Sequence, residues 1–73
     1  MWIANRKRRE FTNVQTGMRI EITDHAVLIW LLSTSMTPSY LGKVHGHDSA
    51  EQIYKNIRGY LTARDLLLME FEE

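Results

Sequence analysis

Apolar and polar positions alternate over residues 18–23, which read Met-Arg-Ile-Glu-Ile-Thr. This period of two is typical of a strand with one buried face. Residues 11–14 before it are β-prone, and the Gln-Thr-Gly segment at 15–17 supplies a glycine that tolerates a positive φ. The pattern therefore predicts a β-hairpin formed by these two segments.

A nearly uninterrupted apolar run follows, from Ala26 to Leu32. Thr23 or Asp24 precedes it, and both residue types cap helices by accepting backbone N–H groups. Because a helix that is apolar all round is a buried one, we interpret residues 24–33 as a central buried helix. The run is far shorter than the roughly 20 residues that a membrane-spanning helix needs, so no membrane partner is predicted.

A second, short helix is predicted from its start and stop signals. Thr37 followed by Pro38 fits a cap residue and a proline at the first helical position, where the missing N–H costs nothing. The helix is expected to run to about His45, and Gly46 is expected to end it.

A third helix is predicted over residues 48–64. It opens with Asp48 and, three residues later, Glu51, a pair that resembles a capping box. Apolar residues then recur every four positions, at Ile53, Ile57 and Leu61. The last apolar segment, at about 66–71, alternates with glutamates and is interpreted as a strand.

Residues 37–61 resemble a helix-turn-helix, with Gly42 in the first helix of the pair and Gly46 in the turn. A small residue lets the second helix cross closely, and a glycine permits the turn. The stretch 51–61, followed by Asp-Leu-Leu-Leu at 65–68, looks like the recognition helix and first wing strand of winged helix-turn-helix regulators.

With the hairpin and the capped apolar helix in front, residues 10–72 are similar to the effector domains of bacterial response regulators and ToxR-like activators. The resemblance implies a small winged-helix-like α+β domain over residues 10–73, in the order β-β-α-α-α-β, with an N-terminal hairpin, three helices and a C-terminal strand. Residues 1–9 lack periodicity and are interpreted as a basic N-terminal arm.

Length and composition narrow the class of protein. The chain has 73 residues, of which 44% are hydrophobic, and it contains no cysteine. This length suits one small folded domain. Disulfides and thiolate metal sites are excluded. The N-terminal sequence shows no signal-peptide pattern, so we expect a cytoplasmic protein.

The formal net charge of zero conceals a gradient along the chain. Residues 1–23 carry a net charge of +3, residues 24–64 carry +1 and residues 65–73 carry −4. A basic head is typical of a nucleic-acid contact, but it is equally typical of a solvated arm.

The resemblance implies a transcriptional regulator of bacterial, phage or plasmid type that binds double-stranded DNA, as a homodimer or with a protein partner. The helix at 48–64 would enter the major groove, where amide and basic side chains contact base edges or phosphates. The basic arm would follow the backbone or enter the minor groove. The candidate DNA-binding residues are Arg6, Lys7, Arg8, Arg9, Lys43, Gln52, Lys55, Asn56, Arg58, Thr62 and Arg64.

Other chemistry is less well supported by the sequence. His45 and His47 lie two positions apart in a glycine-containing turn and do not share a face, so no metal site is predicted. The chain shows no phosphate-binding loop, dinucleotide fingerprint or carboxylate pair with evident roles, so we expect neither a cofactor nor an enzyme. The alternative is a protein-binding adaptor or inhibitor on the same scaffold, which would dock a partner through the acidic edge at 65–73 or by strand addition.

Overall fold

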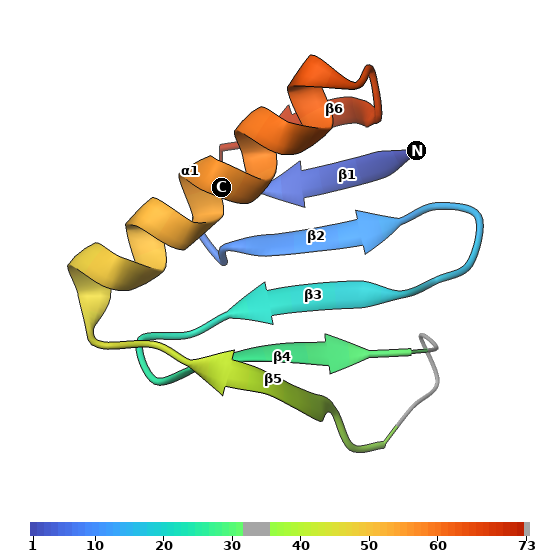
Figure 1. Cartoon of the computed structure of the whole chain (residues 1–73). Coiled ribbons are helices and arrows are strands. Elements are labelled where there is room, and N and C mark those ends of the chain that lie inside the picture. The colour runs from blue at the N-terminus through green and yellow to red at the C-terminus, as the bar shows by residue number, and fades with distance from the viewer. Residues whose placement is uncertain (32–35, 73) are drawn as a thin grey trace.

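The computed structural model describes residues 1–31 and 36–72. Figure 1 shows one sheet crossed diagonally on one face by a helix, α1 (His47–Ala63). The strands are β1 (Trp2–Asn5), β2 (Glu10–Asn13), β3 (Arg19–Ile22), β4 (Ala26–Trp30), β5 (Ser39–Lys43) and β6 (Leu67–Phe71). No helix in these residues is both long and apolar enough to cross a membrane.

The strand order is β5-β4-β3-β2-β1-β6. Strands β1 to β5 form an antiparallel meander. Helix α1 then carries the chain back across the sheet, and β6 pairs in parallel with β1. Such a parallel pair needs a long crossover connection, which α1 provides.

Side-chain acceptors hold the tight turns between strands. Asn13 Oδ1 accepts the backbone N–H groups of Gln15 and Thr16 between β2 and β3, and Gly17 takes a φ of 78° there. Between β3 and β4, Thr23 Oγ1 accepts the N–H groups of His25 and Ala26. These local bonds fix the turns without help from the core.

The core lies between α1 and the covered face of the sheet. Its buried side chains, among the described residues, are Ala4, Phe11, Ile22, Val44, Ala50, Tyr54 and Leu61. The rings of Phe11 and Tyr54 stack at 4.9 Å between centroids, which joins the middle of the sheet to the middle of the helix.

The prediction of a winged-helix domain with three helices is wrong, because the described residues form six strands and one helix. The expected helix at 24–33 is instead a turn followed by β4; residues 32 and 33 lie outside the described part. A short apolar run fits both a buried helix and a strand. Here the β-branched Val27 and Ile29 favour the strand, and Thr23 caps a hairpin turn instead of a helix.

The prediction of a short helix at 37–45 is also wrong, because these residues contain the edge strand β5. Pro38 directly precedes this strand, a position where its missing N–H removes no bond from the ladder. Gly46, expected to end that helix, instead takes a φ of 96° immediately before α1.

Three expected elements are confirmed: the hairpin of β2 and β3, the helix at about 48–64 as α1, and the last strand as β6. Residues 2–5, interpreted from the sequence as part of a basic arm, form β1 in the interior of the sheet. Residues 6–9 form the turn from β1 to β2. The basic run is therefore a structured loop.

Candidate interaction surface on the uncovered face of the sheet

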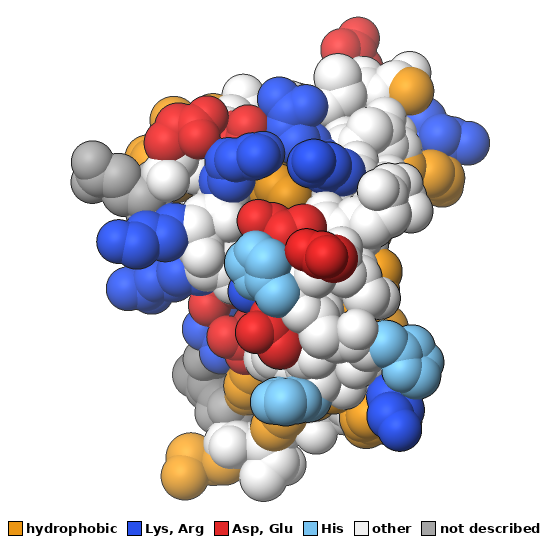
Figure 2. Space-filling view, turned by 90° about the vertical axis from the view of Figure 1, so that its left-hand side faces the viewer, with side chains coloured by type: hydrophobic (Ala, Val, Ile, Leu, Met, Phe, Trp, Pro, Cys, Tyr) orange, Lys and Arg blue, Asp and Glu red, His pale blue; other side chains and the backbone are white. Residues whose placement is uncertain are grey.

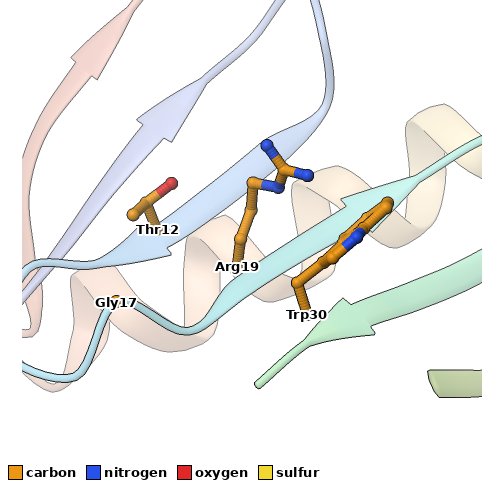
Figure 3. Close-up of a pocket in the computed structure, with 4 residues that line it drawn as sticks. All are labelled: Thr12, Gly17, Arg19 and Trp30. Carbon is orange, nitrogen blue, oxygen red and sulfur yellow. The ribbon is translucent and has the colours of Figure 1, made fainter. Parts of the chain in front are cut away.

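Side chains on the face opposite α1 form a surface that no other described element covers. Figure 3 shows Thr12, Arg19 and Trp30 projecting from this side, with the helix behind the sheet. We call it the outer face. The strand register arranges its side chains in two rows across the strands. The Arg19 row contains Met69, Ile3, Thr12, Arg19 and Trp30. The Glu21 row contains Phe71, Asn5, Glu10, Glu21, Leu28 and Tyr40.

Six residues of the outer face are large and hydrophobic: Ile3, Leu28, Trp30, Tyr40, Met69 and Phe71. Tyr40 is 64% exposed, Met69 45% and Phe71 47%. An antiparallel sheet with one solvated face ordinarily carries polar side chains there, and a parallel pair is ordinarily covered on both faces. Both departures make the outer face a candidate interaction surface.

Arg19 and Trp30 form the centre of a shallow pocket on this face. The guanidinium carbon of Arg19 lies 4.2 Å from the centroid of the Trp30 ring, a cation–π contact. Thr12 and Gly17 complete the lining of a depression of about 160 Å³. Arg19 Nε is buried and has no hydrogen-bond partner among the described residues. Because an unpaired buried donor is costly, the pocket is suited to an anionic acceptor such as a carboxylate.

Two carboxylates lie beside this pocket. Glu10 and Glu21 are direct cross-strand partners in the Glu21 row. Like charges at such a position destabilise a sheet, so this pair favours a partner that brings a positive charge. The two rows therefore present one cation and two anions between apolar ends.

The predicted DNA-binding residues of the basic run lie in the loop between β1 and β2. Arg9 Nη1 lies 2.9 Å from Asp24 Oδ1, and Arg6 Nε lies 3.9 Å from Glu72 Oε2. The Lys7 and Arg8 side chains are exposed. Figure 2 views the molecule from the side of this loop and shows acidic and histidine side chains among the basic ones.

The remaining predicted residues are divided between the helix and the sheet. Gln52, Lys55, Asn56 and Thr62 are exposed on α1, as the helical spacing predicts, whereas Lys43 ends β5 on the outer face. Several are already engaged within the chain. Gln52 donates to Asn56, and Thr62 donates to the backbone of Arg58. The Arg64 guanidinium stacks 3.7 Å from the centroid of the Tyr60 ring.

Arg58 belongs to a polar cluster that joins α1 to β6. Its Nε donates to Glu70 Oε2 at 2.9 Å, and the Tyr54 hydroxyl donates to the same oxygen at 2.6 Å. Burial raises the pKa of Tyr54 above its usual 10.0, and the bond to Glu70 raises it further. Burial alone would raise the pKa of Glu70, but the bonds from Tyr54 and Arg58 leave it below its usual 4.5. The cluster therefore holds an ionised carboxylate and a neutral phenol.

The histidines near the start of α1 do not build a metal site with the acidic side chains around them. Among the described residues, no group of three or more histidine and acidic side chains is placed to hold a metal ion. His47 instead lies 3.9 Å from both Asp24 and Glu51, at the margin of an ion pair.

The outer face was not predicted from the sequence, although part of its signal is visible in the alternation of apolar and polar residues at 18–23. Arg19 and Glu21 are the polar positions of that pattern. Their neighbours Trp30 and Leu28 come from the segment that was interpreted as a helix, so the rows could not be assembled without β4.

The chain was also compared with known proteins, and no family model, no curated protein and no solved structure matches it.

Proposed function

We propose that the protein is a protein-binding module that recognises its partner through the outer face of the sheet. The observation that supports this most is the exposure of large apolar side chains on a sheet face that would ordinarily be polar. The partner surface that fits has apolar groups opposite the two ends of the rows and a carboxylate opposite Arg19. We infer that this module works in the cytoplasm, in keeping with a chain that contains no cysteine.

The electrostatics of the outer face favour a protein over a nucleic acid. Arg19 and Lys43 are balanced there by Glu10 and Glu21. Nucleic-acid affinity depends on an excess of positive charge along the phosphate backbone. A balanced face with aromatic and aliphatic ends is instead typical of protein interfaces, which are enriched in aromatic residues and methionine.

The binding of duplex DNA by α1 stays a prediction. The helix-turn-helix from which it was inferred is not formed, because β5 takes the place of its first helix. The measurement that decides it is binding to random-sequence duplex DNA at roughly 50 and 200 mM salt, because released counterions make phosphate-dominated binding fall steeply with salt. Under the protein-binding proposal we expect no salt-sensitive complex with duplex DNA. A steep salt dependence that Lys55→Ala with Arg58→Ala abolishes would favour the regulator instead.

Site-specific photocrosslinking in the organism that encodes the protein tests the proposal directly. A photoreactive phenylalanine derivative at Phe71 or Tyr40 samples the outer face. The same group at Tyr60, which is 54% exposed on α1, is the matched control. We expect a discrete adduct from both outer-face positions and none from the helix position. We also expect Trp30→Ser to remove the adduct.

Equal adducts from all three positions would show nonspecific capture and contradict the proposal. So would the lack of any adduct from the outer face. Because Trp30 is only partly buried, Trp30→Ser should leave the fold intact, and the thermal unfolding of the variant checks this.

A further inference from the structure

We propose, resting on the function proposed above, that the partner on the outer face is a second copy of this chain, related by a two-fold axis that runs across the strands. The two copies would pack with their outer faces against each other. Helix α1 of each copy would then lie on the side of its sheet that faces away from the interface. Such a contact is isologous, so the outer face must be complementary to itself.

The two rows supply that complementarity. Members of the Arg19 row and the Glu21 row lie two residues apart on the same strand in β1, β2, β3, β4 and β6. A two-fold axis that runs between the rows exchanges them while keeping every strand over its own copy. Each side chain of one row then faces the side chain two positions away on the same strand of the second copy.

This exchange places opposite charges together at the centre of the interface. Arg19, whose Nε has no hydrogen-bond partner in the described part of the chain, would face Glu21 of the second copy. Glu21 would in turn face Arg19 of the second copy. The carboxylate would enter the pocket beside Trp30. Each Glu10–Glu21 pair would gain the positive charge that it lacks within one chain.

The apolar residues are matched by the same operation. Trp30 would face Leu28 of the second copy on β4, and Met69 would face Phe71 of the second copy on β6. Apolar contacts therefore lie on both sides of the charged centre. This arrangement resembles the aligned packing of two sheets in a sandwich, in which inner side chains interdigitate over about 10 Å.

A two-fold axis parallel to the strands is disfavoured by the same residues. Such an axis between β2 and β3, at the centre of the face, would keep each row against its own copy and bring the Glu10–Glu21 pairs of the two chains together. Four carboxylates would then meet between two apolar ends. The charge pattern thus selects one of the two symmetric ways to pack these faces.

Charge reversal tests this arrangement with the full chain. The wild-type protein is expected to form a dimer of twice the 8.6 kDa chain mass in sedimentation equilibrium. Arg19→Glu and Glu21→Arg each place like charges in both central contacts and should weaken the dimer at least about tenfold. An equimolar mixture of the two variants should form a heterodimer, because every central contact becomes complementary again.

Lys55→Glu is the matched control, since it reverses a charge on the exposed side of α1, and it should leave the dimer constant unchanged. Recovery in the mixture shows that the single variants still fold. A wild-type chain that stays monomeric at about 100 μM, or single variants that dimerise as the wild type does, would overturn the proposal. Variants that do not recover on mixing would overturn it as well.

The two proposals can fail separately. A monomeric chain that still gives outer-face adducts with another protein would refute the second copy and retain the protein-binding module. A monomeric chain without such adducts would refute both.

Discussion

The Tyr54 hydroxyl donates a 2.6 Å hydrogen bond to Glu70 Oε2, and this bond joins the middle of α1 to strand β6. Arg58 donates to the same oxygen, so one carboxylate receives two side-chain donors from the helix. Because β6 has a strand neighbour on one side only, the cluster is a principal contact that holds this edge strand to the helix.

Replacing Tyr54 by phenylalanine keeps the stacked ring and removes the donor. We expect the free energy of unfolding to fall by about 1.5–3 kcal/mol, the range for a hydrogen bond to a charged group. Urea denaturation measures this change. Tyr60→Phe is the control, because that side chain is exposed, and it should stay within about 0.5 kcal/mol of the wild type.

The same cluster predicts how stability depends on pH. The pKa of Glu70 is lowered in the folded state, so its contribution is fully present above its usual 4.5 and is lost as pH falls through the folded value. The pKa of Tyr54 is raised, so its contribution is present below 10.0 and is lost as pH rises through the folded value. Urea midpoints across pH should show both declines. Glu70→Gln should flatten the acid decline, and an unchanged acid slope would contradict this assignment.

Asp65 occupies a left-handed position at the end of α1, with a φ of 58°. Leu66 N–H donates to the Leu61 carbonyl and Asp65 N–H to the Thr62 carbonyl, the two bonds of a Schellman motif. Glycine is the favoured residue there, so Asp65→Gly should stabilise the protein by about 1 kcal/mol. Asp65→Asn is the matched control, because it removes the carboxylate from the helix C-terminus and keeps the side chain. If Asp65→Gly raises the stability no more than Asp65→Asn does, the left-handed backbone conformation of Asp65 costs no stability.

Two glycines should respond in opposite directions to alanine. A Cβ added at either Gly46 or Gly59 meets no atom within 4 Å, so packing does not distinguish them. Gly59 lies within α1, where alanine should stabilise the fold by about 1 kcal/mol. Gly46 has a φ of 96° and a ψ of −176°, a region essentially restricted to glycine, so Gly46→Ala should destabilise the fold by about 1–3 kcal/mol. Thermal unfolding of both variants tests the signs, and a shared sign would contradict this reasoning.

Local patterns in the sequence were sufficient for β2, β3, α1 and β6. Each has a clear hydrophobic period or turn signal of its own. Strand β4 had neither, because Val27, Leu28 and Ile29 are consecutive apolar residues. Thr23 satisfies backbone N–H groups equally well at a helix start and in a hairpin turn, so its chemistry did not separate the two structures.

The outer face depended on information that no single segment contains. Arg19 meets Trp30 only because β3 and β4 pair in one register. A shift of one residue would move every side chain of a strand to the other face of the sheet. A two-row surface therefore becomes visible only once all the strands and their registers are known.

The parallel pairing of β1 with β6 has a consequence for how the chain folds. The first strand in sequence finds its second neighbour only after more than sixty residues have followed it, as Trp2 pairs with Leu67. Contacts of such sequence separation slow folding, because loop-closure entropy is lost before the contact forms. During synthesis, the meander emerges from the ribosome with the backbone edge of β1 unpaired. This edge of β1 is then open to wrong strand pairing until β6 arrives and covers it.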